Sequence, residues 1–444
     1  MKIENLKIEN LLRHLLSALL FLLPWQTIWI YQERYLNGVK WEYGTLGFYA
    51  TEGLLWLCAV LFMIWYWNKF RAKFSNFQIF KFSFSSDRIF LISMLLLIIY
   101  QLSSTLWSTD AQIALQQSLR VIEAAILFLV ILIGPLSFER AAKWFIAGAV
   151  IQALLGIWQF LTQSNFSSTL LGLSAHPAWQ AGSSIVGNEA GRWLRAYGGF
   201  PHPNILGGYL VIALAALLPK KLSFIIYHLS FSIIAVALFF TFSRSAWIAL
   251  VATLFIALVV NWKKYFPIAT ISLVIFFILS IIYWPLVATR LARITQNEIQ
   301  STNERITGYS EAISIWKKHT WLGVGAGNYT LVLHQLQPNR PGWEYQPVHN
   351  AAVLFLTEMG IIGTTIFSLF LFSFFLFTKS IGIRTTNLFI LILPFLPIIF
   401  LDHYSYSSLI GLLMTAIYSG LLIRKMKSQS VPALSTLYPR QHIV

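Results

Sequence analysis

Three polar side chains at the edges of long apolar runs have the chemistry of a catalytic site. His349 stands in Pro347-Val-His-Asn350 at the start of an apolar run, and an imidazole there can accept a proton from an alcohol near neutral pH. Arg195 and Arg244 lie within one turn of other apolar runs, where a cation is costly unless it is paired or reaches the surface. Guanidinium groups hold phosphate in a bidentate fork. The residue types predict an anion site with a base, and a structural hydrogen-bonding role explains a lone histidine equally well.

Other basic residues and histidines fall in the same polar segments. His202 and His334 share the placement of His349 but have weaker surroundings. Those that we expect to be ordinary solvated loop residues are Arg290, Arg293 and Arg340. The remaining ones are Arg192, Arg305, Lys317 and Lys318. A cluster of this size calls for an anionic ligand, because short loops on the outer side of a membrane are normally poor in lysine and arginine.

Three glutamates lie near these segments. Glu358 follows His349 by nine residues, about 13 Å of helical rise, which is too far to orient the imidazole directly. It is placed to line an internal cavity. Glu52 and Glu123 fall near the outer ends of apolar runs, and we expect them to form structural ion pairs.

Several familiar catalytic patterns do not occur in the sequence. There is no Asp-x-Asp, Gly-x-Ser-x-Gly or His-Glu-x-x-His, and no metal-ligand spacing is recognisable, so we expect no metal. Gly323-Val-Gly-Ala-Gly327 resembles a phosphate-binding glycine loop, but no βαβ unit surrounds it, which excludes a dinucleotide fold. We expect a tight turn there with a backbone amide donor exposed.

Composition excludes a water-soluble globular protein. Hydrophobic residues make up 57% of the 444 residues and charged residues 11%, and the mean hydropathy is +0.67, whereas soluble chains carry about 25% charged residues. The net charge of +16 does not indicate nucleic-acid binding, because no motif for it is present. In a membrane protein, basic excess first reflects topology. The single cysteine, Cys58, excludes a disulfide framework.

The apolar runs predict an all-α membrane protein, a polytopic bundle of about 12 transmembrane helices. Their expected spans are 12–31, 45–67, 89–107, 119–136, 142–161, 204–219, 222–241, 245–261, 266–288, 348–377, 385–402 and 405–423. Every second connection carries lysine or arginine, which places both termini in the cytoplasm. The N-terminal apolar stretch lacks a cleavage site for a signal peptide and is expected to be retained as the first span.

Two long connections, 163–204 and 289–348, then fall on the non-cytoplasmic face, and loops beyond about 15 residues are usually functional. Within the second, residues 304–319 carry Ile306, Tyr309, Ile313 and Trp316 at helical spacing, which predicts an amphipathic helix at the membrane surface. We expect one polytopic domain over residues 1–426 and a cytoplasmic tail over 427–444.

Four segments, in order, resemble the O-antigen ligase and polymerase superfamily of bacterial membranes. They are Arg195-Ala-Tyr-Gly-Gly-Phe-Pro-His-Pro-Asn204, Phe240-Thr-Phe-Ser-Arg244, Arg305 through Tyr329 with Trp321-Leu-Gly-Val-Gly325, and His349-Asn350 followed by Glu358-Met-Gly360. Each is a weak signal alone. Together, over about residues 195–360 and on the predicted outer face, they are specific at the level of the superfamily.

The resemblance implies glycosyl transfer without metal or cofactor on the outer face of the bacterial cytoplasmic (inner) membrane. The donor would be an undecaprenyl-diphosphate-linked glycan, and the acceptor a hydroxyl of a glycan, a lipid core or a protein. The residues implied to hold the diphosphate are Arg195, Arg244 and Arg305, with His349 as the base. The supporting residues are Asn204, Asn350, Glu358 and Gly360. The expected partners are these substrates and membrane lipid, with no nucleic acid.

Other functions remain open at this point. An O-antigen or exopolysaccharide polymerase, or a protein O-glycosylating ligase, differs only in the acceptor, which the sequence does not name. A polysaccharide or lipid transporter or flippase would show internal repeats and ionisable residues at the bilayer midplane, whereas the polar residues here concentrate at the outer interface. A non-enzymatic assembly factor is the remaining alternative.

Overall fold

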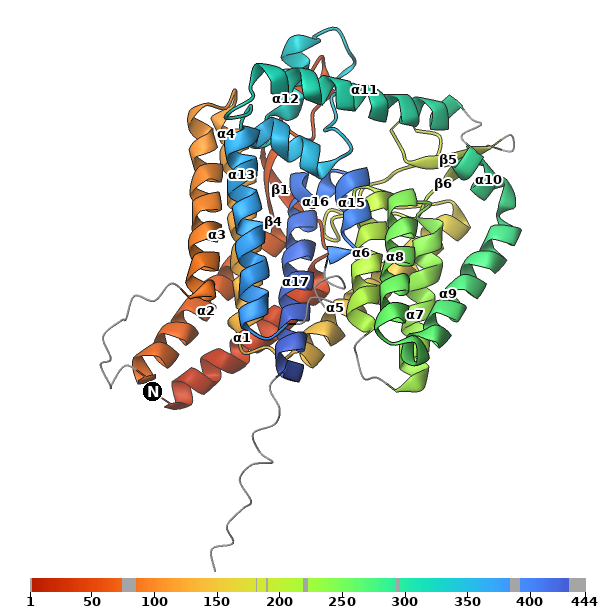
Figure 1. The fold of residues 1–444 in the computed structure, drawn as a ribbon. Coiled ribbons are helices and arrows are strands. Elements are labelled where there is room, and N and C mark those ends of the chain that lie inside the picture. Colours follow the sequence, from red (N-terminus) through yellow and green to blue (C-terminus); the bar gives the residue numbers. More distant parts are fainter. Residues whose placement is uncertain are drawn as a thin grey trace, which may run out of the picture.

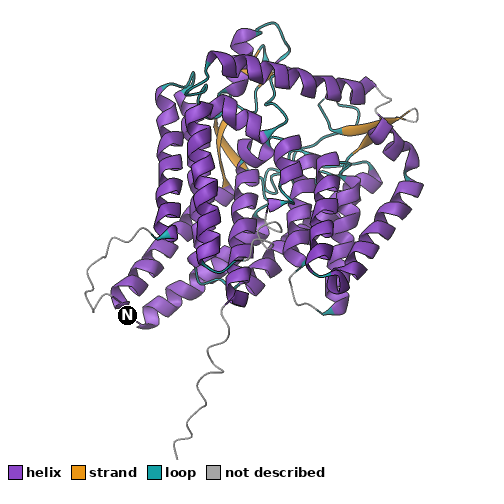
Figure 2. Ribbon diagram, viewed as in Figure 1, coloured by secondary structure: helices purple, strands orange, loops and turns teal. Residues whose placement is uncertain are grey.

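Apolar helices dominate the computed structural model, which describes residues 2–73, 85–180, 182–188, 191–218, 223–292, 296–383 and 392–430 (Figures 1 and 2). Within these residues, seven helices are long and apolar enough to cross a membrane. They are α2 (Ala50–Lys73), α3 (Ser86–Ser103), α4 (Ala111–Ile133), α5 (Phe138–Thr162), α9 (Trp262–Ile282), α13 (Ala351–Ser380) and α17 (Leu409–Ser430). Three apolar helices are shorter: α6 (Pro203–Leu217), α7 (Phe224–Phe240) and α8 (Arg244–Val260). The predicted all-α membrane class is confirmed.

The first predicted span, 12–31, is wrong in its second half. Helix α1 (Lys2–Leu22) ends two residues before Pro24, and Ile28–Gln32 forms strand β1, which pairs antiparallel with β4 (Leu46–Tyr49). Apolar content alone cannot distinguish helix from strand. The β-branched and aromatic residues of Ile28–Gln32 favour the strand, and proline favours the break before it.

The predicted span 385–402 also differs. Residues 384–391 lie outside the described part of the chain, and the remainder forms the short helix α15 (Leu396–Leu401). Asp402 and His403 follow, and then comes α16 (Tyr404–Ser407) before α17. Helix α17 continues four residues beyond the expected domain boundary at 426, and residues 431–444 lie outside the described part.

Helix α6 forms the centre of the core. Every residue from Pro203 to Leu217 is buried, and α6 packs against α5, α7, α8 and α17. Its Gly207 and Gly208 allow close approach, because an added Cβ would lie 2.7 Å from Ala246 Cβ or 1.9 Å from Tyr404 Oη. Around this centre, α3 packs along α13 and α4 along α17 (Figure 1). The core thus fixes the start of α6 against the start of α8 and the α15–α16 junction.

One end of the molecule carries most of the polar connections, and we call it the loop end (top of Figure 1). The elements of these connections are α10 (Trp284–Ala292), α11 (Gln296–Lys318), α12 (Tyr329–Leu336) and the hairpins β2–β3 (Tyr35–Leu36, Val39–Lys40) and β5–β6 (Ile185–Asn188, Gly191–Leu194). Two short 3-10 turns, η1 (Ser104–Leu106) and η2 (Gly342–Glu344), complete the fold.

Helix α11 confirms the predicted helix over residues 304–319 and begins eight residues earlier. Its packing face differs from the predicted apolar stripe. Ala312 and Ile315 are buried against the cluster that includes Tyr345 and Leu354, whereas Ile306 and Ile313 are 65% and 47% exposed. The stripe of isoleucines therefore faces away from the protein core.

Backbone contacts lock the glycine-rich segment onto a kink in α13. Gly360 has φ +64, and a Cβ on it would lie 2.2 Å from the Trp321 carbonyl oxygen. The amide of Gly325 donates to the Glu358 carbonyl at 2.8 Å, and that of Gly327 donates to Glu358 Oε2 at 2.7 Å. The expectation of an exposed amide donor in this segment is wrong, because these amides donate hydrogen bonds to Glu358 inside the protein.

Candidate active site

Asp402 is the centre of a buried polar network at the break between α15 and α16. Its Oδ2 accepts a hydrogen bond from Asn204 Nδ2 at 2.8 Å, and its Oδ1 accepts one from the His403 amide at 2.9 Å. Its carbonyl oxygen accepts from the amide of Ala351, the first residue of α13, at 3.0 Å. The broken helix therefore places one carboxylate, 3% exposed, against the starts of both α6 and α13.

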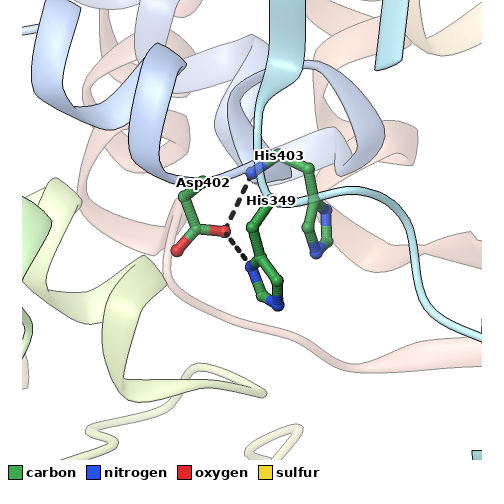
Figure 3. A group of neighbouring side chains, drawn as sticks. All are labelled: His349, Asp402 and His403. Atoms are coloured by element: carbon green, nitrogen blue, oxygen red, sulfur yellow. Dashed lines mark hydrogen bonds and ion pairs between the residues drawn. The ribbon is translucent and has the colours of Figure 1, made fainter. Parts of the chain in front are cut away.

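His349 precedes α13 and points one ring nitrogen at this carboxylate. Its Nδ1 lies 3.8 Å from Asp402 Oδ1, which is an ion-pair distance longer than a hydrogen bond. Figure 3 shows the other ring nitrogen directed away from Asp402. The side chain is 23% exposed, so that the far nitrogen can be approached while the near one faces the carboxylate. This arrangement orients an imidazole for proton transfer.

The network continues from Asn204 to Arg195. Arg195 donates to Asn204 Oδ1 at 2.7 Å through one terminal nitrogen, and its Nε donates to the Thr241 carbonyl at 2.6 Å. The Asn204 amide thus accepts from the guanidinium and donates to the carboxylate. Arg195, Asn204, Asp402 and His349, which span more than 200 positions of the sequence, form one continuous polar chain.

Two further histidines flank Asp402. Burial lowers the pKa of His403 to about 4, and burial with the charge of Arg195 lowers that of His202 to about 3. His403 Nδ1 pairs with Ser407 Oγ at 2.7 Å, while His202 caps α6 and pairs through Nε2 with Ser184 Oγ at 2.8 Å. Both rings are therefore neutral near pH 7 and engaged in structural contacts. His202, expected to have weak surroundings, belongs to the site.

The charge of Asp402 is favoured by its neighbours. Burial by itself raises the pKa of a carboxyl, but His349, followed by His403 and His202, holds the pKa of Asp402 well below its usual range. The carboxylate is consequently ionised at neutral pH and can stabilise a positive charge on the imidazole that faces it.

The turn between α7 and α8 gathers three arginines. Phe242 adopts a left-handed backbone conformation, with φ +46, and the carbonyls of Thr241 and Phe242 accept from Arg195 and Arg290 respectively. Arg244, the first residue of α8, donates to the Arg290 carbonyl at 3.4 Å. The expectation that Arg290 is a solvated loop residue is wrong. It is 6% exposed, because α10 folds back over the turn.

The contacts of the remaining arginines show which of them lie near the site. Arg305 on α11 lies close enough to His403 for its charge to lower the pKa of that imidazole further. Arg340, expected to be a solvated loop residue, is instead held in an ion pair with Glu311. Arg293 lies outside the described residues.

Two of the predicted supporting residues, Asn350 and Glu358, accept hydrogen bonds from backbone amides and so fix nearby segments. Asn350 caps α13 through Val353 N at 3.0 Å and donates to Tyr309 Oη at 3.2 Å. Glu358 accepts from the amide of Gly327 and, at 3.4 Å, from that of Tyr329, and so supports the glycine-rich segment. Glu52 and Glu123 form a separate buried group, in which Trp56 Nε1 donates to Glu123 at 2.7 Å and Arg120 lies nearby.

His349, Asp402 and His403 together form a group that could hold a metal ion, since each offers a ligand atom and these atoms lie within 4.8 Å of one another. Sequence spacing did not reveal this group. Both oxygens of Asp402 already accept protein hydrogen bonds, and His403 Nδ1 is paired with Ser407. The nearby guanidinium groups of Arg195 and Arg305 disfavour an added cation. We therefore interpret the group as an oriented base.

The sequence analysis missed Asp402, His403 and Arg290. Asp402 is the last residue of the predicted span 385–402, and His403 follows it in the short gap before the next span, on the predicted outer side. The two are a titratable pair that interrupts an otherwise apolar stretch. That position was a usable signal. Arg290 carried no comparable signal, because its burial depends on how α10 folds back.

Fold and site together define a polytopic membrane protein with an arginine-rich, His–Asp polar centre at one end of its helices. Residues 229–368 match a family model described as O-antigen ligase. The match confirms the resemblance to the O-antigen ligase superfamily and supports a membrane glycosyltransferase of that type, in keeping with a multi-pass protein of the bacterial inner membrane. It includes Arg244, Arg305 and His349, whereas Arg195, Asn204 and Asp402 lie outside it. No curated protein matches the chain.

Proposed function

We propose that this protein transfers a saccharide from an undecaprenyl-diphosphate donor to an acceptor hydroxyl at the outer face of the bacterial inner membrane. The observation that carries the proposal is the pairing of His349 with Asp402 beside a turn that gathers arginines. This combination suits a reaction that needs a base for an alcohol and positive charge for a departing diphosphate.

In the proposed reaction, the far nitrogen of His349 takes the proton of the acceptor hydroxyl as its oxygen attacks the anomeric carbon. The bond between that carbon and the diphosphate oxygen breaks, and the polyprenyl diphosphate leaves with the electron pair. Asp402 orients His349 and stabilises the imidazolium that forms. It acts through His349 and is therefore a positioning residue.

The diphosphate is assigned to Arg195, Arg244 and Arg305. Arg244 begins α8, where the helix N-terminus adds favourable potential for an anion. Arg305 contributes its charge from α11, near His403. Arg195 adds its charge from a buried position and also fixes Asn204 against Asp402. Because diphosphate is already a good leaving group, charge neutralisation replaces a general acid, and the proposal requires no metal.

The membrane orientation belongs to the same proposal. The loop end faces the non-cytoplasmic side, and both termini are cytoplasmic, since lysine and arginine occur on every second connection. The donor's lipid tail would lie among the apolar helices while its diphosphate and glycan reach the site.

Deletion of the gene, followed by analysis of surface glycans, tests the function in cells. Accumulation of lipid-linked polymer identifies a ligase, and loss of polymer length identifies a polymerase. Wild-type protein and His334→Ala should restore the glycan, whereas His349→Ala should not, at equal abundance in the membrane. His334 is a matched control because it also lies at the loop end and pairs with Asn37. Unchanged glycans after deletion would contradict the proposal.

A further inference from the structure

Near Asp402, the ring of His403 neighbours two other rings that come from separate parts of the chain. The ring centroid of Tyr43 lies 5.9 Å from that of His403, and the His403 centroid lies 5.3 Å from that of His349. Tyr43 comes from the loop between β3 and β4, His403 from the α15–α16 junction and His349 from the residue pair before α13. We call Tyr43 and His403 the ring wall.

Tyr43 is built into this position. It packs against the buried cluster that contains Trp41 and Leu46, and the turn before β4 is closed by the Thr45 amide and hydroxyl on the Trp41 carbonyl. Among the described residues, its hydroxyl has no hydrogen-bond partner. Burial, and then the charges of Glu42 and Asp402, raise the pKa of Tyr43, so the hydroxyl remains a donor at neutral pH.

His403 and Arg195 connect to different oxygens of Asp402. Asn204, which accepts a hydrogen bond from Arg195, donates to Asp402 Oδ2. The backbone amide of His403 donates to Asp402 Oδ1, which is also the oxygen that His349 faces. His403 is held by Ser407 through Nδ1. The anion-binding side and the ring side of the site are therefore contributed by distinct segments, with His349 next to the rings.

The position of the base decides which substrate the ring wall can contact. A general base must come within hydrogen-bond distance of the hydroxyl that it deprotonates, and that hydroxyl belongs to the acceptor. A sugar ring offers apolar C–H faces and a rim of hydroxyls, which match an aromatic ring that also carries a polar group.

We propose that Tyr43, held in place by the buried ring of His403 behind it, forms part of the subsite for an acceptor saccharide, with the Tyr43 hydroxyl donating a hydrogen bond to the sugar. The proposal rests on the proposed function and adds the chemical class of the acceptor, a sugar hydroxyl rather than a peptide side chain. It also gives the segment between β3 and β4, which lies outside the family match, a role in specificity.

Steady-state kinetics with full-length protein in lipid nanodiscs test the subsite. The probes are an undecaprenyl-diphosphate-linked oligosaccharide as donor and lipid A–core glycolipid as acceptor. Tyr43→Phe, which removes one hydrogen bond, should raise the acceptor KM about fivefold, and Tyr43→Ala about thirtyfold, with the donor KM unchanged. Tyr35 is the matched control, because it is exposed in strand β2 of the same connection between α1 and α2 and its hydroxyl already donates to Glu33. A rise in donor KM, a fall in kcat alone or the same effect from Tyr35→Ala would overturn the assignment.

A binding measurement separates this inference from the proposed function. Saturation-transfer NMR with the free core oligosaccharide should show contact in wild-type protein and its loss in Tyr43→Ala. If that pattern appears while no transfer occurs, the ring wall is a glycan site and the proposed function fails. If the oligosaccharide does not bind, or binds Tyr43→Ala equally, the subsite is wrong whatever the activity. If Tyr43→Ala lowers the unfolding temperature, the same binding measurement is made with Tyr43→Phe, and weaker binding than in wild-type protein supports the subsite.

Discussion

Replacing Asp402 with asparagine isolates the electrostatic part of the proposed mechanism. The asparagine oxygen can still accept from Asn204 or from the His403 amide but not from both, so the change removes the charge and one hydrogen bond and leaves the shape. At the 3.8 Å between Asp402 Oδ1 and His349 Nδ1, opposite unit charges attract by about 4 kcal/mol at an effective dielectric constant of about 20. Since about 1.4 kcal/mol corresponds to a factor of ten, the loss approaches about a thousandfold.

The nearby guanidinium of Arg195 offsets part of this attraction, and we therefore expect kcat to fall about 100- to 1000-fold in Asp402→Asn. The donor KM should stay within about threefold of wild type, because the lost interaction strengthens only as the imidazolium forms. Because the pKa of Asp402 lies well below its usual range, the carboxylate itself stays ionised from about pH 5 to 9, and kcat of each variant is compared at its own pH optimum.

The assay is initial-rate transfer from the lipid-linked donor in nanodiscs, with the unfolding temperature of each variant measured in parallel. Glu33→Gln is the control, since this exposed carboxylate pairs with Lys40 away from the site. A correctly folded Asp402→Asn variant that retains kcat within tenfold of wild type at its own pH optimum would refute the reasoning.

Four further predictions concern the arginines, the kink, the buried imidazole and the absence of a metal requirement. Arg244→Lys should lower kcat/KM for the donor at least tenfold, because lysine keeps the charge but loses the bidentate fork; kinetics equal to wild type would reduce Arg244 to a point charge. Gly360→Ala should destabilise the fold by at least about 3 kcal/mol, since the left-handed backbone and the Trp321 carbonyl exclude a Cβ, whereas Gly53→Ala, with 3.5 Å of clearance, should be tolerated in thermal unfolding. His403 binds a proton at a pKa of about 4 when folded and 6.5 when unfolded, so stability should fall by about 2 kcal/mol between pH 7.5 and 5, and His403→Gln should lose less; equal losses would place the titration elsewhere. Dialysis against EDTA should leave transfer unchanged, and a loss restored by zinc or magnesium would assign the His349–Asp402–His403 group to a metal.

Much of the helical architecture could be predicted, because a membrane span is a local property of about 20 residues. The starts of α6, α8 and α13 fall within three residues of the predicted starts of their spans. The strand at Ile28–Gln32 was not predicted: its residue types favour a strand, but its pairing with Leu46–Tyr49 is a tertiary contact that the length of an apolar run does not reveal.

Part of the site could likewise be predicted from the sequence, and part could not. His349, Arg195 and Asn204 were recognisable from residue type and motif, and the structure links them in one chain. Asp402 was not recognised, because it lies 53 positions from His349 and inside a stretch expected to be two spans. Only the break between α15 and α16 gives it its place, and that break depends on packing.

Transfer by purified protein tests the central proposal most directly. Wild-type protein in nanodiscs, given an undecaprenyl-diphosphate-linked oligosaccharide and a lipid A–core or glycan acceptor, should release undecaprenyl diphosphate and form an equal amount of glycosylated acceptor. His349→Ala should form neither product while unfolding at the wild-type temperature. Equal product from His349→Ala, or a wild-type protein that moves the intact lipid-linked glycan across the bilayer without cleaving it, would contradict the proposal.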